Sequence, residues 1–423
     1  MLVPIIVVGA LLLTACSSNG NDNNNNAAGS SSTEKAVKAT GTPIKVGLLC
    51  DLSGPTQVIG TNLCPGFLDY VKLLNDVKGG VDNHPIEVDE ADNAYEVPKS
   101  VTAYEKMHSE GAVAILCYGT PIALGLNDQI TRDKVPCLTP GFGIAQAGDP
   151  AKYPYQFPLA ASYYSQGAAA VEYALAHVDS DNPKIAYLYY DNPAGQEPLP
   201  VLRALASRDG FEFKTFAVPA PGLEMSAQLT DITQRYKADF VIAHLFGRAP
   251  SVSIKGFREA GYPLNQVISL VWGSAEADIQ AAGGFGVAEG YNTLQFAAVG
   301  QDLPAIREIV AMYRAKGEKA PSALTDNSVY YNRGVFVADL LVQALRNALK
   351  AGGTVTGESV KAGLEQISHF DSGGLAPPLT VSATDHEGGG FTRVFQVKGG
   401  KLTPVTGWVN PDHKLVLSLV KSG

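Results

Sequence analysis

Segments with the pattern of buried strands alternate with segments of helical spacing along most of this chain. The apolar runs at 44–49 and 113–116 are typical of strands that are buried on both faces. Between them, the apolar residues of 66–77 recur at the spacing of one helix face. Strands that alternate with helices form parallel sheets through right-handed crossovers. The sequence therefore predicts an α/β fold.

The alternation falls into two series, and the second begins near Ser165. The first series predicts strands at 44–49, 86–90, 113–116 and 135–139 and helices at 66–77, 97–109 and 120–131. The second predicts helices at 166–177, 197–208, 225–236 and 249–260 and strands at 185–189, 212–218 and 240–243. Two series predict two doubly wound lobes. Ligands of such sheets bind beyond the carboxyl ends of the strands.

The N-terminal segment has the pattern of an export signal. An apolar run, 2–13, is too short to span a membrane and is followed by Leu13-Thr14-Ala15-Cys16, a pattern similar to the bacterial lipobox. It implies cleavage between Ala15 and Cys16 and a diacylglycerol group on the Cys16 thiol. No Lys or Arg precedes Cys16, so the usual basic region is missing and a start upstream of Met1 stays open. The alternative is a buried strand that ends in a core cysteine.

The polar tract after Cys16 predicts a flexible tether. It carries too little apolar area to offset the entropy of ordering. About two dozen residues of coil reach roughly 25–30 Å. We therefore expect a signal peptide at 1–15 and a lipidated tether at 16–42, with the globular part outside the cytoplasm and anchored to the cell membrane.

Charge and hydropathy exclude some classes of partner. The net charge of -9 and the lack of a Lys/Arg cluster argue against a nucleic-acid partner, which requires a basic face. No later segment reaches transmembrane length. We expect a monomer without a cofactor.

Four cysteines remain besides Cys16, and an exported chain can pair them in three ways. The short loops favour Cys50–Cys64 and Cys117–Cys137, although geometry decides the pairing. The spacings do not match zinc patterns, so we expect no metal site.

Several short motifs, in order, resemble those of one family. They are Ile44–Leu49, Leu52-Ser53-Gly54-Pro55 with Gly60, Asn75–Val81, Val113–Thr120, Val135–Pro140, Gln166-Gly167 and the segment 239–261. Together they cover about residues 44–345 and resemble the type I periplasmic binding proteins, the branched-chain amino-acid receptors of ABC importers. Their order and spacing carry the resemblance.

The resemblance implies two lobes joined by three hinge crossovers near 162–164, 291–296 and 380–385. Lobe one would comprise 43–163 and 295–382, and lobe two 164–294 and 383–423. The hinges would close the lobes around a small-molecule ligand. The closed form would then dock on the membrane permease of an ABC transporter.

The resemblance also implies which loops of lobe one contact the ligand. They follow the first, third and fourth strands and contain Gln57, Tyr118, Gly119, Thr120, Thr139, Gly141 and Phe142. Thr120 directly precedes a predicted helix, so its hydroxyl and the next backbone amides suit a carboxylate or carbonyl oxygen. The alternative is that Thr120 only caps this helix. Gly141 would let the backbone approach the ligand, or is only a turn glycine.

Lobe two would contribute Asn192, Phe246 and Trp272, and one of Tyr330 and Tyr331 would face the cleft. Amino-acid-binding members place an acidic residue near Trp272 to hold the ammonium group. Here Glu276 lies four residues further on. A hydroxyl near Gly143 and a tyrosine near Ala194 are also missing. The ligand classes left open are a branched-chain amino acid, an amide and a small aromatic or apolar carboxylate. For Trp272 core packing stays open, and for Arg333 a salt bridge.

The chain carries no nucleophile elbow, P-loop or HExxH motif. A binding protein is therefore predicted rather than an enzyme. Two alternatives remain: a hydrolase with His244 as its base, and a receptor of the same fold that signals through a partner.

Overall fold

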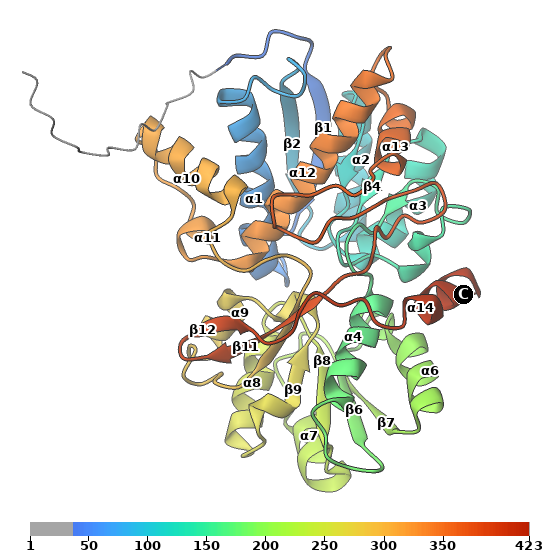
Figure 1. Ribbon diagram of the computed structural model, residues 1–423, viewed down its shortest axis with the longest axis vertical. Helices are drawn as coiled ribbons and strands as arrows, with labels where there is room; N and C mark the ends of the chain where they lie inside the picture. Colours follow the sequence, from blue (N-terminus) through green and yellow to red (C-terminus); the bar gives the residue numbers. More distant parts are fainter. Residues whose placement is uncertain (1–36, 423) are drawn as a thin grey trace, which may run out of the picture. The chain divides into compact units, whose positions relative to one another are not determined.

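Two β-sheets organise the part of the chain that the computed structural model describes, residues 37–422 (Figure 1). The first sheet has the order β2-β1-β3-β4-β5, and all its strand pairs are parallel. Its strands are β1 (Ile44–Cys50), β2 (Ile86–Asp92), β3 (Ile115–Leu116), β4 (Cys137–Leu138) and β5 (Gln156–Phe157). The predicted α/β class is confirmed.

The second sheet has the order β12-β11-β10-β9-β8-β6-β7. Its strands are β6 (Lys184–Tyr190), β7 (Glu212–Val218), β8 (Phe240–His244), β9 (Val267–Ser269), β10 (Asn292–Gln295), β11 (Arg393–Lys398) and β12 (Lys401–Pro404). The pairs from β7 to β10 are parallel, whereas β11 and β12 extend the sheet in antiparallel fashion. The antiparallel edge was not predicted.

Helices precede and follow the strands of both sheets. Between or packed beside the strands of the first sheet lie α1 (Gln57–Asp76), α2 (Val97–Ser109), α3 (Thr120–Asp133), α10 (Pro304–Lys316), α11 (Ser322–Thr325), α12 (Val329–Lys350) and α13 (Gly357–Glu365). The remaining α-helices are α4 (Tyr163–Leu175), α5 (Pro193–Gln196), α6 (Leu199–Asp209), α7 (Ser226–Thr230), α8 (Ala249–Glu259), α9 (Glu276–Ala281) and α14 (His413–Ser422). Short turns η1 (Ala145–Gly148), η3 (Leu264–Gln266) and η4 (Val271–Gly273) are 3₁₀, and η2 (Asp231–Tyr236) is π-helical.

The chain passes between the two sheets three times. It leaves the first sheet after β5 and returns after β10, where α10 to α13 follow. It then enters the second sheet again at β11. These passages bring segments distant in sequence to the same edge of each sheet.

Helices α1 and α12 lie side by side and contact each other closely (Figure 1). Two glycines allow this approach. A Cβ on Gly66 would lie 2.1 Å from the carbonyl oxygen of Tyr331, and one on Gly334 would lie 2.0 Å from that of Leu63. Larger side chains at these two positions would push the helices apart.

Helix α1 begins at Gln57, nine residues before the predicted start at Gly66. Gly60, Pro65 and Gly66 weaken the local helical pattern, and Pro65 lies inside the helix. Tertiary contacts nevertheless stabilise the first turns of the helix. The buried carboxylate of Asp51 accepts hydrogen bonds from the backbone N–H and the hydroxyl of Thr56, at 2.7 and 2.6 Å, and so fixes the start of α1.

Two other predicted helices are interrupted. The helix predicted at 197–208 is preceded by the separate turn α5, and α6 begins at Leu199 next to Pro198 and Pro200. The helix predicted at 225–236 changes from α to π after Thr230.

Disulfides join Cys50 to Cys64 and Cys117 to Cys137. This is the pairing that the short loops favoured. The first ties β1 to α1, and the second ties the loop after β3 to β4. Cys16 and the predicted signal peptide lie outside the described residues. Within 37–422, no helix combines the length and the apolar composition that crossing a bilayer requires.

Candidate ligand-binding site

A small cavity lies where loops from both sheets meet. Ten residues line it: Thr56, Ile59, Tyr95, Tyr118, Gly119, Thr120, Phe142, Tyr163, Phe246 and Trp272. Most follow the carboxyl ends of strands β1 to β4, β8 and β9, which is the edge where parallel sheets bind ligands.

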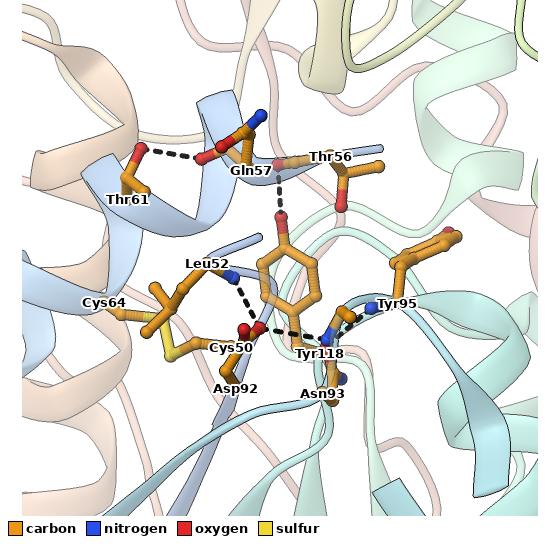
Figure 2. Close-up of a disulfide and its surroundings, with 11 residues drawn as sticks. Cys50, Leu52, Thr56, Gln57, Thr61, Cys64, Asp92, Asn93, Tyr95 and Tyr118 are labelled. Atoms are coloured by element: carbon orange, nitrogen blue, oxygen red, sulfur yellow. Dashed lines mark hydrogen bonds between the residues drawn. A yellow bond between two sulfur atoms is a disulfide. The ribbon is translucent and has the colours of Figure 1, made fainter. Parts of the chain in front are cut away.

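One end of the cavity is formed by the start of α1. The hydroxyl of Tyr118 donates to the carbonyl oxygen of Thr56 at 3.2 Å, as Figure 2 shows beside the Cys50–Cys64 disulfide. Asp51 lies behind Thr56 and is fully buried. Its carboxylate already accepts the backbone N–H groups of Gly54 and Thr56 and the Thr56 hydroxyl. The Asp51 carboxylate therefore stabilises the turn before α1 and is not available to a ligand.

The start of α3 forms a second polar end. Gly119 caps the helix with a φ of +100°, and a Cβ there would lie 2.4 Å from the Tyr95 ring. A glycine is thus needed for both the backbone and the packing. Thr120 donates its hydroxyl to the carbonyl oxygen of Gly143 at 3.0 Å. The hypothesis that Thr120 caps α3 is therefore wrong, because Gly119 holds that position.

The N-termini of α1 and α3 both face the cavity through their first residues. The first backbone N–H groups of a helix have no partner within that helix, and the helix dipole makes this end positive. The residue after Thr120 is Pro121, which has no N–H, so the donors at this end are the amides of Thr120 and Ile122. The start of α3 therefore suits an anion, whereas the amides of Thr56, Gln57 and Ile59 at the start of α1 already donate to Asp51, Gly54 and Thr56.

Aromatic rings form the rest of the wall. Phe142 lies 6.2 Å from Tyr118 and 5.5 Å from Trp272, measured between ring centroids. Tyr95 lies 6.3 Å from Tyr118 and 6.4 Å from Phe246. These are the distances at which aromatic pairs attract each other. The rings form one connected wall that spans both sheets.

No residue that lines the cavity, among those the structure describes, carries a charge. Burial raises the pKa of the phenols of Tyr95, Tyr118 and Tyr163 above the ordinary value, so all three are neutral at neutral pH. The site therefore offers hydroxyls, backbone amides and aromatic faces, and no carboxylate for an ammonium group.

Six of the sequence-predicted site residues line the cavity: Tyr118, Gly119, Thr120, Phe142, Phe246 and Trp272. Trp272 is also largely buried, with 4% of its surface exposed. The Trp272 side chain therefore both lines the cavity and packs into the core.

Five predicted residues lie elsewhere. Gln57 is exposed on the first turn of α1, and Thr139 is buried and donates weakly to the carbonyl oxygen of Phe157 at 3.4 Å. The side chain of Asn192 caps α5 by accepting from Gly195. Gly141 and Tyr330 lie behind the wall: the Gly141 carbonyl accepts the indole N–H of Trp272 at 2.8 Å, and the Tyr330 ring lies 5.8 Å from Trp272. These two residues position the wall.

Thr56, Tyr95 and Tyr163 line the cavity but were missed by the sequence prediction, whereas Ile59 lies in the segment 57–60 that the resemblance implicated. Tyr95 follows β2, a strand whose loop the prediction did not consider. Its place directly after a strand of the first series is the signal that could have identified it. Tyr163 begins α4, three residues before the predicted helix start.

Glu276 does not reach the cavity. Its carboxylate accepts the backbone N–H of Val329 at 2.8 Å, and burial raises its pKa to about 7. His244 is also absent from the lining. Its Nδ1 lies 3.1 Å from the Tyr187 hydroxyl, its ring packs 4.5 Å from that of Tyr163, and burial lowers its pKa to about 3. A histidine held neutral behind the wall is poorly placed to act as a base on a ligand.

The arrangement of His, Cys, Asp and Glu side chains within 37–422 does not favour a metal site. The group with suitable spacing there is Cys50, Cys64 and Glu90, but both sulfurs are engaged in a disulfide.

Residues 43–401 match the sequence profile of the family described as periplasmic binding protein. A solved structure titled as an ABC transporter permease from the Pseudomonas fluorescens group is 29% identical, covers 90% of this chain and 95% of its own, and has a TM-score of 0.81. None of the curated proteins matches this chain.

Two further structures are similar in fold. A branched-chain amino acid ABC transporter protein from Thermus thermophilus with bound valine is 21% identical, covers 90% of this chain and 99% of its own, and has a TM-score of 0.78. A solute-binding protein from R. palustris in complex with 4-hydroxybenzoate is 19% identical, covers 88% and 99%, and has a TM-score of 0.73.

The two sheets, the three passages between them and the cavity at their shared edge define a two-lobed binding protein. The chain belongs to the periplasmic binding protein family. Proteins of this family act outside the cytoplasm and bind small solutes rather than convert them.

Proposed function

We propose that this chain is the solute-binding component of an ABC importer and that its ligand is a small carboxylate with an apolar or aromatic body and no ammonium group. The observation that carries the proposal is the composition of the cavity wall. It combines six aromatic side chains with the N-terminus of α3 and contains no acidic side chain. Such a wall favours a negative head group and a flat or apolar body.

The absence of a lining carboxylate disfavours an amino acid. An ammonium group taken from water into this cavity would lose hydration without an ionic partner, which is costly. Aromatic faces can hold a cation at about 0.5–2 kcal/mol, but one face of Trp272 already covers the guanidinium of Arg333, 4.9 Å from the ring centroid. A second cation on this ring would be repelled by the charge of Arg333. Valine and 4-hydroxybenzoate, the ligands named for the two similar structures, share a carboxylate.

The proposed mechanism is noncovalent capture. The ligand carboxylate docks on the start of α3, and the loops with Phe246 and Trp272 close over its body. Lobe one is proposed to comprise 43–163 and 295–382, and lobe two 164–294 and 383–423, with hinges where the chain passes between the sheets. The loaded form then docks on the permease.

A thermal-shift screen tests the ligand class, because a ligand that binds only the folded state raises the melting temperature. The panel contains aliphatic and aromatic carboxylates, their amides, branched-chain amino acids, urea and glycine betaine. The proposal expects the largest shift from a carboxylate without an amine. A larger shift from an amino acid or from betaine would contradict it, and turnover of an amide or ester would favour the hydrolase.

Anchoring through Cys16 is a separate part of the proposal. It rests on the lipobox-like pattern before Cys16 and on the polar tract after it. Mass spectrometry of the protein isolated from membranes tests it: an N-terminal peptide that begins at an acylated Cys16 supports the anchor, and an unmodified Cys16 contradicts it. The binding proposal stands independently on residues 37–422.

A further inference from the structure

Arg333 on α12 is a fully buried cation that lies directly behind the cavity wall. The carbon at the centre of its guanidinium lies 4.9 Å from the Trp272 ring centroid, 4.8 Å from that of Phe296 and 5.1 Å from that of Tyr330. All three distances are within the range of a cation–π contact. Three rings therefore enclose one charge.

The hydrogen bonds of Arg333 all go to uncharged acceptors on the second sheet and its loops. One terminal nitrogen donates to the carbonyl oxygen of Val271 at 2.5 Å. The other donates to the Ser274 hydroxyl at 3.3 Å and to the side-chain oxygen of Gln295. Among the described residues no carboxylate forms a salt bridge with Arg333, so the salt-bridge hypothesis for this residue is wrong.

These bonds close the turn η4 onto strand β10. Val271 and Ser274 flank Trp272 in the turn, and Gln295 ends the strand after which the chain returns to the first sheet. Gln295 also donates to the carbonyl oxygen of Ser274 at 2.7 Å. Arg333 thus connects a helix packed on α1 to both sides of the turn that carries Trp272.

Trp272 is held at two further points. Its indole N–H donates to the carbonyl oxygen of Gly141, and its own carbonyl accepts the Tyr330 hydroxyl at 2.8 Å. Neither bond fixes the tilt of the ring face that turns away from the cavity. The flat guanidinium covers that face and has a fork of donors that a lysine lacks.

We propose that Arg333 is a positioning residue of the ligand cavity, which sets the tilt of the Trp272 wall and couples it to the passage at β10. It touches no ligand and acts through Trp272. The inference rests on the proposed function only in taking this cavity as the ligand site, and the position of Trp272 can be measured without any ligand.

The test uses tryptophan fluorescence, because the chain has two tryptophans. Trp408→Phe leaves Trp272 as the single reporter. In this background we compare Arg333→Met, Arg333→Lys and, as the matched control, Asp339→Asn. Asp339 lies on the same helix and accepts the buried Tyr70 hydroxyl, away from the cavity wall. The readout is the acrylamide quenching constant of Trp272 well below the melting temperature.

Arg333→Met is expected to raise the quenching constant at least about twofold, and Asp339→Asn to leave it unchanged even where both lower the melting temperature. Arg333→Lys is also expected to loosen the ring, because one ammonium group cannot reach Val271 and Gln295 together; it carries the test alone if the Met variant does not fold. Equal quenching in Arg333→Lys and the parent would overturn the positioning role, and so would equal changes in Arg333→Met and Asp339→Asn.

A second test measures ligand binding, with 4-hydroxybenzoate and 3-methylbutanoate as probes. Binding of whichever probe the parent protein binds is expected to weaken at least about tenfold in Arg333→Met and to stay within about twofold in Asp339→Asn. Unchanged binding in Arg333→Met overturns the inference. If the parent binds neither probe, that result bears on the proposed function, and the quenching constants alone decide the role of Arg333.

Discussion

Trp272 donates its indole N–H to the carbonyl oxygen of Gly141 at 2.8 Å, and this hydrogen bond joins the turn after β9 of the second sheet to the loop after β4 of the first. Gln166 donates to the same carbonyl at 2.9 Å and to that of Ala161 at 2.8 Å. The wall of the cavity and the first passage between the sheets therefore share one acceptor.

Two substitutions of Trp272 distinguish the contribution of its ring to ligand binding from the contribution of its hydrogen bond. Trp272→Phe keeps an aromatic wall but loses the bond to Gly141, a net loss of about 1 kcal/mol, so we expect about fivefold weaker binding of the best carboxylate from the screen. Trp272→Leu also removes the ring, and we expect a loss of about 100-fold. Calorimetric titration measures both. Trp408→Phe is the control and is expected to bind as the parent does; equal affinities for all three variants would exclude Trp272 from the site.

Thr120 is expected to matter for the anionic head group. Thr120→Val keeps the shape but removes the hydroxyl that donates to Gly143, which would leave a buried carbonyl with one partner fewer. We expect a loss of about 1 kcal/mol in the free energy of unfolding and about tenfold weaker carboxylate binding. Thr120→Ser retains the hydroxyl and should recover most of both. If the Val variant binds as tightly as the parent, the start of α3 does not hold the ligand.

Much of this site follows from sequence, and the rest depends on tertiary contacts. The apolar runs of β1, β6 and β8 predict these strands directly, and the loops after β3, β4, β8 and β9 were implied by the resemblance to the family. The early start of α1 was not, because Asp51 stabilises it from outside the helix while Pro65 argues locally against it. The position of Arg333 could not be predicted either, since it depends on the rings of Trp272 and Phe296, which come from segments distant in sequence.

Glu197, which lies between α5 and α6, forms a hydrogen bond with Ala145 at the start of η1. Its titration should make the free energy of unfolding depend on pH. Its carboxylate accepts the backbone N–H of Ala145 at 2.7 Å, and burial raises its pKa from 4.5 to about 7. The folded state therefore binds this proton more tightly than the unfolded state does. The free energy of unfolding should fall as pH rises from about 4.5 to about 7, by up to about 3 kcal/mol from this group.

Glu197→Gln isolates that contribution. The amide oxygen can still accept from Ala145 but does not titrate in this range, so the difference in unfolding free energy between parent and variant should shift with pH in favour of the variant above pH 7. Urea unfolding at pH 5 and pH 8 measures it. His244, whose low pKa acts in the opposite sense, is common to both proteins and cancels. Parallel pH profiles for the two proteins would contradict the assignment.

The Cys117–Cys137 disulfide braces the loops that carry Tyr118 and Thr139. Replacing both cysteines by alanine opens a loop of 20 residues, for which we expect a loss of about 3 kcal/mol in unfolding free energy. Ligand binding should weaken as well, because Cys117 directly precedes Tyr118, Gly119 and Thr120. The Cys50–Cys64 pair, with a separation of 14 residues, is the matched control for stability. Full stability of the Cys117/Cys137 double variant would show that the packed strands alone hold these loops.

Isothermal titration with two matched pairs tests most directly whether the cavity selects a carboxylate without an ammonium group. Valine differs from 3-methylbutanoate only by its ammonium group, and phenylalanine differs in the same way from 3-phenylpropanoate. Because no lining side chain offers a carboxylate to that group, we expect at least one amine-free acid to bind at least about tenfold more tightly than its amino acid. Tighter binding of valine or phenylalanine than of the matching acid would contradict it.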